Sequence, residues 1–416
     1  MNLTLATLPQ HLASLTSSDW NKLFSLLPEI EQTTNFGEME DIQYLTPDVV
    51  FAPDIDSAEI VLQFIDVAYD LGLCFSFDWG EWEEGMEILN NRAKVNFNKL
   101  DAVTLCKLIT TIIRKDKYSE GTLVNLFNDG TVHRIIIALK NHYSKGLITD
   151  KENNKLYLAD QLHIDHPEFF QRFIAILNAA NINYELLVGA KDIWCRDYMP
   201  IQVRYNKFVK FTYHEDYSHL IPEDIKARTI FSTIVLDGGN VIKGGQGIII
   251  TDKVLKDNPN LSKEELIAEL QTLFETQNIY IIPRMPYDEF GHADGMVRGL
   301  MKRAVFVNDY SDTKHSPSFI NSFAKAMEKH SLVPIKIPYK EVIRKNYENV
   351  DVAIGCYLNF LQMENLFIVP TFSELGETNE EVLKVFEQYF QPTPLDCTAI
   401  ANEGGVLNCI SWTFKE

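Results

Sequence analysis

The stretch EGGVLNCISW, residues 403–412, sets two glycines, an asparagine and a cysteine in an apolar run that predicts a strand. Cys409 has two interpretations. A buried thiol behaves as a small hydrophobic group. A thiolate is the strongest nucleophile that protein side chains offer near neutral pH. The other polar segments of the chain decide between the two.

Three further segments place polar groups at predicted strand ends, where packing of a hydrophobic core does not explain them. They are DIWCRDYMP (192–200), LDGGN (236–240) and FGHADG (290–295). Each has an ordinary explanation when taken alone. Arg196 and Asp197 could form a structural ion pair, DGGN could be only a turn, and a single histidine is often a satisfied structural residue. Only the combination indicates a catalytic site.

Together these segments supply what a reaction on a guanidinium group requires. A planar cation with five N–H donors is best held by two carboxylates, and Asp197 and Asp294 are available. Its central carbon is a poor electrophile, so it needs a thiolate such as that of Cys409. A departing amine needs a proton donor, a role that suits His292 oriented by Asp237.

The second part of the chain alternates strands and helices, which predicts an α/β domain. Strands are expected at 155–160, 184–188, 201–213 (a hairpin turning at Asn206-Lys207), 240–252 (a hairpin turning at Gly244-Gly245), 278–284, 303–309, 333–339, 356–360 and 365–372. Helices are expected at 166–181, 261–274, 316–330 and 379–390, with Ser262 and Glu265 forming a capping box. A glycine-rich GxGxxG opening is missing, so a Rossmann nucleotide domain is not supported.

The first part of the chain, to about residue 142, predicts helices at 57–73, 100–117 and 129–143. The polar segment SKGLITDKENNK (144–155) separates the two parts, giving a mainly helical domain at 1–145 and an α/β domain at 152–416. The acidic, aromatic stretch FDWGEWEEG (77–85) is either a solvated loop or a contact surface.

Composition restricts the partners. The 416 residues carry a formal net charge of −20, which disfavours nucleic acid and anionic membranes and favours a cationic small molecule. The first twenty residues have no signal-peptide pattern and no run is long enough for a membrane helix, so we expect a cytoplasmic protein. The six cysteines show neither disulfide nor zinc-ligand spacing.

The motifs WCRD, DGGN, GHADG, CYLNF and GGVLNC, in this order, resemble the guanidino-modifying enzyme superfamily, most closely the branch of agmatine deiminases and bacterial peptidyl-arginine deiminases. The resemblance covers residues 155–416. It implies the pentein fold, in which five strand-strand-helix-strand modules form a pseudo-fivefold ring, an α/β propeller, around a central site.

The resemblance also implies roles. Cys409 would attack the guanidinium carbon, His292 would be the acid and base, and Asp237 would orient the histidine. The substrate-binding residues implied are Asp197, Asp294, Trp194, Asn359 and Asn240. A thiouronium intermediate would be hydrolysed to a ureido product and ammonia, with no metal and no organic cofactor.

Two departures from the family pattern bear on the substrate. Asn408 stands where agmatine deiminases usually have histidine. Residues 213–216 read Tyr-His-Glu-Asp where bacterial peptidyl-arginine deiminases hold a substrate carboxylate with arginines. Because acidic groups there would repel a carboxylate, agmatine or a related guanidino amine is favoured over peptidyl-arginine or free arginine.

Alternatives remain open. His292-x-Asp294 is the spacing that begins a non-haem iron triad, which would need His315 or His330. Some proteins of this fold bind partners without catalysis, and an amidinotransferase would pass the same intermediate to an amine. The first 145 residues resemble a small bacterial helical domain without known chemistry, through the stretches at 77–82 and 114–127. We expect it to mediate homo-oligomerisation or to bind a protein partner.

Overall fold

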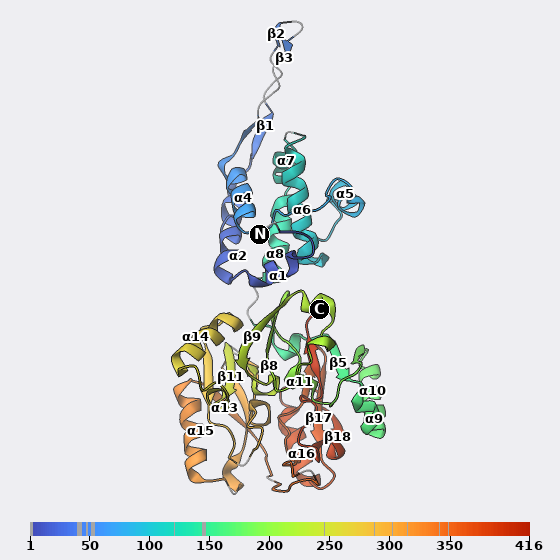
Figure 1. Cartoon of the computed structure of the whole chain (residues 1–416), viewed down its shortest axis with the longest axis vertical. Helices are drawn as coiled ribbons and strands as arrows, with labels where there is room; N and C mark the ends of the chain where they lie inside the picture. The colour runs from blue at the N-terminus through green and yellow to red at the C-terminus, as the bar shows by residue number, and fades with distance from the viewer. Residues whose placement is uncertain are drawn as a thin grey trace. The chain divides into compact units, whose positions relative to one another are not determined.

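The computed structural model describes residues 3–39, 44–46, 49, 50, 55–119, 121–143, 147–244, 246–286, 288–301, 303–313, 315–340, 342–347 and 349–416. The chain divides into two compact units, Met1–Gly146 and Leu147–Glu416 (Figure 1). Each unit has its own hydrophobic core.

The first unit is mainly helical. Its helices are α1 (Leu8–Ser14), α2 (Ser17–Phe24), α3 (Leu27–Gln32), α4 (Glu59–Asp70), α5 (Glu83–Asn90), α6 (Ala102–Asp116), α7 (Thr122–Asn128) and α8 (Thr131–Tyr143). Helix α6 buries an apolar stripe that includes Leu105, Leu108 and Ile112, and the carboxylate of Asp101 caps its first turn by accepting from the N–H of Thr104.

Short strands in this unit were not predicted. Strand β1 (Gly37–Met39) pairs with β4 (Ile55–Ser57), and β2 (Tyr44–Thr46) pairs with β3 (Val49–Val50). Strands of two or three residues offer too little alternation of apolar and polar residues to be recognised from sequence.

The second unit contains five three-stranded sheets with the same pairing pattern. In each, the first two strands are antiparallel and the second and third are parallel. The sheets are β19-β5-β6 (Trp412–Phe414, Lys155–Ala159, Tyr184–Leu187), β7-β8-β9 (Ile201–Arg204, Lys207–Thr212, Thr229–Val235), β10-β11-β12 (Ile242–Gly244, Gly247–Thr251, Ile279–Ile282), β13-β14-β15 (Val297–Met301, Ala304–Asn308, Val333–Ile337) and β16-β17-β18 (Leu361–Met363, Leu366–Thr371, Thr393–Asp396).

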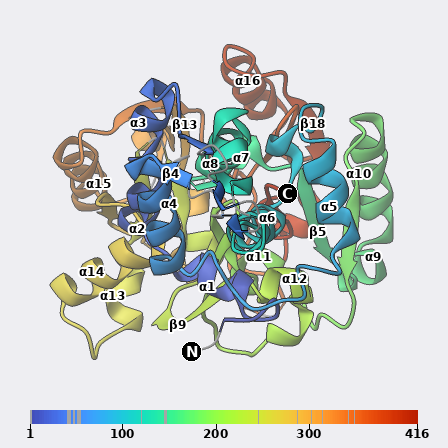
Figure 2. The same cartoon turned by 90° about the horizontal axis from the view of Figure 1, so that it is seen from above.

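A helix lies between the second and third strand of every sheet, as parallel pairing requires a crossover. These helices are α10 (Pro167–Ala179), α12 (Glu223–Lys226), α14 (Lys263–Phe274), α15 (Pro317–Lys329) and α16 (Gly376–Phe386). Figure 2 shows α10, α14, α15 and α16 at the outside of this unit, with strands further inside. The α/β prediction is confirmed, and so is the capping box of Ser262 and Glu265 at α14.

Three local predictions need correction or fall outside the structure. Residues 356–360 (CYLNF) are not a strand, because the buried guanidinium of Arg298 takes the carbonyl oxygens of Leu358 and Phe360, and strand β16 begins only at Leu361. The first hairpin turns at Tyr205-Asn206, one residue earlier than predicted. The predicted turn at Gly244-Gly245 includes Gly245, which lies outside the described residues.

The segment around Cys409 also differs from the prediction. Residues 404–411 are turn and irregular structure, with a turn at 407–410, and the strand β19 covers only Trp412–Phe414. Cys409 therefore sits in a loop just before a strand, where its side chain is free of the alternation that a strand imposes. Among the described helices, none combines the length and the apolar character that crossing a membrane would take.

Candidate active site

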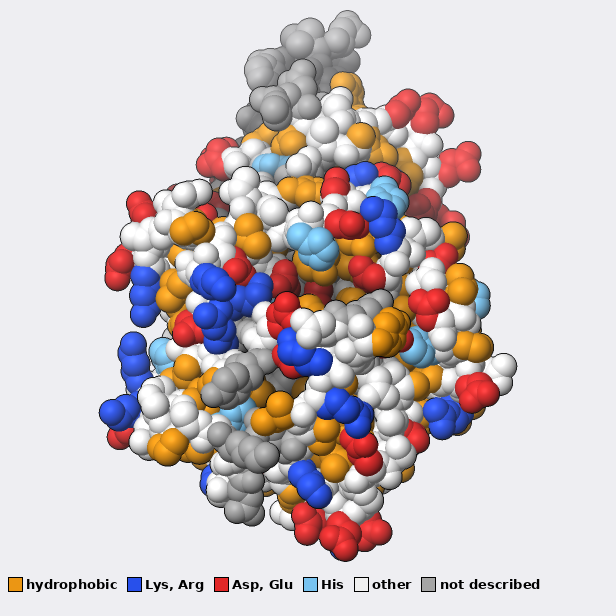
Figure 3. All heavy atoms as spheres, turned by 60° about the horizontal axis from the view of Figure 1, so that its bottom comes forward, with side chains coloured by type: hydrophobic (Ala, Val, Ile, Leu, Met, Phe, Trp, Pro, Cys, Tyr) orange, Lys and Arg blue, Asp and Glu red, His pale blue; other side chains and the backbone are white. Residues whose placement is uncertain are grey.

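The loops that link successive sheets of the second unit converge on one cavity of about 550 Å³. Each link, from the third strand of one sheet to the first strand of the next, contributes a lining side chain predicted from sequence: Trp194 and Asp197 (β6 to β7), Asp237 (β9 to β10), His292 and Asp294 (β12 to β13), Asn359 (β15 to β16) and Cys409 (β18 to β19). Figure 3 shows acidic side chains around a hollow near the centre of the view.

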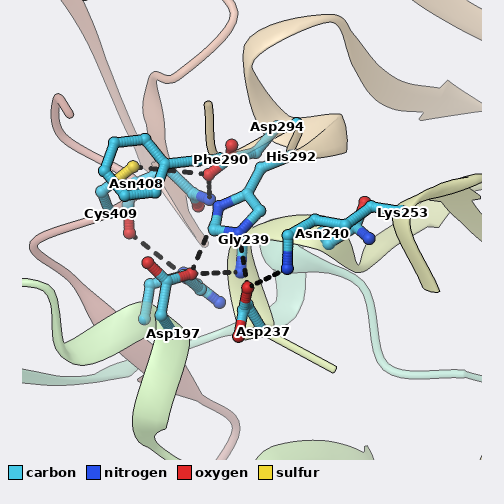
Figure 4. A network of polar contacts seen from close by, with 12 residues as sticks. Asp197, Asp237, Gly239, Asn240, Lys253, Phe290, His292, Asp294, Asn408 and Cys409 are labelled. Carbon is cyan, nitrogen blue, oxygen red and sulfur yellow. Dashed lines mark hydrogen bonds and ion pairs between the residues drawn. The ribbon is translucent and has the colours of Figure 1, made fainter. Parts of the chain in front are cut away.

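His292 forms a hydrogen-bonded pair with Asp237. The distance from Nε2 of His292 to Oδ2 of Asp237 is 2.8 Å, and Nδ1 of His292 lies 3.6 Å from Oδ1 of Asp197 (Figure 4). Burial alone would lower the pKa of His292, but the charges of Asp197, Asp237 and Asp294 raise it to about 9. Burial would likewise raise the pKa of Asp237, but its bonds to His292 and Lys253 hold it below its ordinary range.

Asp197 and Asp294 line the same cavity as this imidazole. The backbone N–H of Gly239 donates to Oδ1 of Asp197 over 2.7 Å. Burial, and the neighbouring charges of Asp237 and Asp294, raise the pKa of Asp197 to about 7 although His292 opposes the shift.

Gly239 leaves room at the point where these groups meet. A Cβ on this residue would lie 2.7 Å from Oδ1 of Asp197, 2.8 Å from Nδ1 of His292 and 3.2 Å from Oδ2 of Asp294. Only glycine brings the backbone this close to two carboxylates and an imidazole.

The thiol of Cys409 faces Asp294 and Asn359. Its Sγ is 3.6 Å from Oδ2 of Asp294 and accepts a hydrogen bond of 3.2 Å from Nδ2 of Asn359. The neighbouring Asn408 donates from its side chain to the same oxygen of Asp294 over 2.8 Å. Burial, followed by the charges of Asp294 and Asp197, raises the pKa of the Cys409 thiol well above its ordinary value.

Trp194 forms part of the cavity wall and packs against Gly405. A Cβ on Gly405 would lie 2.3 Å from Cζ3 of the indole, so this glycine is what permits the contact. The alternative in which Arg196 and Asp197 form a structural ion pair is not what the structure shows. The guanidinium of Arg196 donates instead to the carbonyl oxygen of Asn408 and to Oγ1 of Thr413, behind the loop that carries Cys409.

Asn240 lies outside the cavity lining, unlike the other residues predicted for the site. It is buried, its Oδ1 accepts from the backbone N–H of Thr251 over 3.0 Å, and it is not among the described residues that line the cavity. Sequence reasoning also missed Lys253, whose Nζ donates to Oδ2 of Asp237 over 2.9 Å. No local motif marks this lysine, because its partner lies in a different loop.

Acidic groups are the most numerous charged side chains that line the cavity. Its described lining includes eight carboxyl groups, three histidines and one lysine, Lys253. Those beyond the central group are Asp257, Asp288, Glu289, Asp351 and Glu403.

This location of the negative charge corrects the prediction from sequence, which assigned it to Glu215 and Asp216. Glu215 pairs instead with Lys191, and Asp216 accepts from the N–H of Ser218. Of the stretch at 213–216, only Tyr213 and His214 line the cavity.

The iron-site alternative finds no support in the geometry. Within the described part of the chain, no three or more His, Cys, Asp or Glu side chains are grouped so that they could hold a metal ion. His330 is at the end of α15, with Nε2 at 3.2 Å from the carbonyl oxygen of Ile281.

Comparison with known proteins gives the class. Residues 147–414 match the family described as Porphyromonas-type peptidyl-arginine deiminase. The chain belongs to this family of guanidino-modifying enzymes. Residues 15–145 match a family of unknown function (DUF6508).

Solved structures resemble the chain at low sequence identity. The agmatine deiminase of C. jejuni is 18% identical with a TM-score of 0.54, and that of Enterococcus faecalis is 18% identical with a TM-score of 0.53. A cysteine-to-serine variant of the C. jejuni enzyme with substrate bound is 17% identical with a TM-score of 0.54. Each match covers 65% of this chain and 96% of the other, and shows the fold. No curated protein matches the sequence.

Proposed function

We propose that the second unit is a deiminase that converts a guanidino group to a ureido group and ammonia, and that its substrate is agmatine or a related small guanidino amine. One observation carries the proposal: a single cavity holds a thiol, an imidazole paired with a carboxylate, and two further carboxyl groups. Membership of the peptidyl-arginine deiminase family supports it.

In this proposal Asp197 and Asp294 bind the guanidinium nitrogens from two sides, and Trp194 limits the site to a flat group. Charge-assisted hydrogen bonds to a planar cation are strong and directional, so two fixed carboxylates also orient the central carbon towards the thiol. Asn359, which already contacts Sγ, keeps that thiol in place.

The bound cation is also what activates the nucleophile. The pKa of the Cys409 thiol is raised by burial and by Asp294 and Asp197, so a positive charge placed between these carboxylates favours the thiolate. The thiol gives up its proton to solvent, and the thiolate bonds to the guanidinium carbon. The bond from that carbon to one nitrogen then breaks, and the nitrogen takes a proton from His292 and leaves as ammonia.

Water completes the reaction. His292 accepts a proton from a water molecule whose oxygen bonds to the thiouronium carbon. The carbon–sulfur bond breaks, and the ureido product and the free thiol are formed. The balance is one guanidino group and one water in, one ureido group and one ammonia out, with no metal or organic cofactor required.

The acidic lining of the cavity supports an amine at the other end of the substrate. A terminal ammonium would be attracted by the carboxyl groups of Asp288, Glu289, Asp351 and Glu403, whereas the α-carboxylate of free arginine would be repelled. Peptidyl-arginine and free arginine are therefore the alternatives that the assay must include.

We further propose that the five sheets form the pseudo-fivefold pentein ring, since each repeats the same strand-strand-helix-strand order. The catalytic domain would then be the second unit, predicted as residues 152–416. The first unit, predicted as residues 1–145, would be an accessory domain that acts through oligomerisation or a protein partner.

The test is an assay of three substrates. The full-length protein is incubated with agmatine, free arginine and an arginine-containing peptide, and both ammonia and ureido product are measured. We expect agmatine to be consumed with the highest kcat/KM. Comparable turnover of arginine would contradict the substrate preference, and no ammonia from any of the three would contradict the deiminase.

A further inference from the structure

We propose that Lys253 is a positioning residue that limits how firmly Asp237 holds the proton of His292. Its part in the reaction rests on the function proposed above. Its effect on the imidazole depends only on the geometry of the three side chains.

Lys253 and His292 share a single oxygen atom. Oδ2 of Asp237 is 2.8 Å from Nε2 of His292 and accepts from Nζ of Lys253 over 2.9 Å. The ammonium also donates to Oδ2 of Asp257 over 2.5 Å. Asp257 lies one turn further along the same helix, α13 (Lys253–Asp257), so this bond holds the lysine side chain in place. The cation therefore has one defined position, against the oxygen that the imidazole uses.

The backbone around Lys253 holds the two loops of this pair together. At the end of β11, the N–H of Thr251 donates to Oδ1 of Asn240, in the loop of Asp237. The hydroxyl of Thr251 donates over 2.6 Å to the carbonyl oxygen of Gly291, the residue before His292. A short segment from Thr251 to Lys253 thus supports both partners, and Asn240 is part of that support.

The carboxyl groups around the imidazole explain why the charge of Lys253 affects the proton of His292. His292 faces the carboxyl groups of Asp197, Asp237 and Asp294 and, from its own loop, that of Asp288. Lys253 faces Asp237 and Asp257. Without a cation on Asp237, the full charge of that carboxylate would act on the imidazolium, and a proton held too firmly is transferred poorly to a leaving amine.

The experiment measures protonation of His292 by NMR in full-length protein with labelled histidine and no substrate. The signal is identified by its loss in His292→Gln. Since the pKa of His292 is about 9, the wild-type imidazole is half protonated near pH 9. In Lys253→Met we expect the midpoint to rise by roughly one unit, so that most molecules keep the proton at that pH.

Three further variants complete the test. Lys253→Gln keeps an N–H donor for Asp237 but removes the charge, and it should shift the midpoint in the same direction; it decides the matter if the methionine variant does not fold. Lys253→Arg should restore the wild-type midpoint. Lys256→Met removes an exposed lysine of the same helix and should change nothing.

An unchanged or lowered midpoint in the two neutral variants would overturn the proposal. Kinetics give a second readout in the same two variants. We expect kcat/KM to fall about tenfold and the alkaline limb of its pH profile to move to higher pH, a shift that the loss of a purely structural lysine would not cause. Because the NMR titration contains no substrate, its result stands even if the protein turns over none of the guanidino compounds.

Discussion

Asn359 holds Cys409 through both ends of its side-chain amide. Nδ2 donates to the sulfur over 3.2 Å, while Oδ1 accepts from the backbone N–H groups of Asn408 and Cys409 over 2.9 and 3.2 Å. One buried side chain therefore fixes the loop that carries the thiol and gives the sulfur its hydrogen-bond donor. This arrangement makes the donor and acceptor roles separable by mutation.

Asn359→Asp should keep the two backbone contacts and lose the donor to sulfur. A carboxylate beside Sγ also raises the pKa of the thiol further, so we expect kcat/KM to fall by about tenfold to a hundredfold and alkylation of Cys409 by iodoacetamide to slow. Asn178→Asp, on the exposed face of α10, is the matched control and should affect neither rate. Equal alkylation rates in the Asn359→Asp variant and the wild type would refute the role of this bond.

Asp294→Asn should change binding and thiol reactivity in opposite directions. Oδ2 of Asp294 is 3.6 Å from Sγ and its charge is one cause of the raised pKa of Cys409. Removing that charge should speed alkylation of the free enzyme at pH 8 several-fold, while turnover of a guanidino amine drops by about a hundredfold or more because one of the two carboxylates that bind the cation is gone. Asp309→Asn, at an exposed ion pair with Lys336, serves as control. Slower alkylation would show that the carboxylate does not oppose ionisation of the thiol.

Gly239→Ala should prevent substrate from binding without unfolding the protein. The added methyl group would lie within 3.2 Å of Asp197, His292 and Asp294, in the space proposed for the guanidinium. We expect a loss of kcat/KM of at least about a thousandfold, the scale on which misplaced catalytic groups act. Gly376→Ala, where a Cβ meets nothing within 4 Å, should stay active. Near-normal activity of the Gly239→Ala variant would place the substrate elsewhere.

Asp197→Asn should stabilise the protein relative to the wild type, by an amount that grows as the pH rises from about 4 to 7. The folded carboxyl has a pKa of about 7, above the value of roughly 3.9 in an unfolded chain, so in this window only the unfolded state ionises and the wild type loses stability. Asparagine does not titrate. The difference in free energy of unfolding, variant minus wild type, should grow by on the order of 3 kcal/mol and level off above pH 7. Urea denaturation at pH 4.5 and 7.5 measures it; a constant difference would contradict the raised pKa assigned to Asp197.

Much of the second unit could be predicted because its signals are local. The capping box of Ser262 and Glu265 and the apolar periodicity of α14 depend on residues four or fewer positions apart. The lining residues Cys409, His292, Asp237, Asp197, Asp294, Trp194 and Asn359 could be chosen because a guanidinium group demands their chemistry and the family motifs mark their positions.

The misses share a physical cause, which is a partner distant in sequence. CYLNF looks like a strand, yet Arg298 from another sheet takes two of its carbonyl oxygens. The amide oxygen of Asn240 accepts from the backbone N–H of Thr251, a contact that no motif around Asn240 marks. Nothing in the sequence distinguishes Lys253 from another helical lysine, and only the structure shows its contact with Asp237. Local pattern cannot show any of these contacts.

The most direct test of a thiol nucleophile at position 409 is to trap the covalent intermediate. The protein is mixed with agmatine, quenched in acid within the first turnovers, digested and examined by mass spectrometry. We predict that the peptide containing Cys409 gains the mass of the substrate less one ammonia, and that Cys409→Ala shows neither this adduct nor ureido product. Ureido product formed by the alanine variant at the wild-type rate would contradict the proposed mechanism.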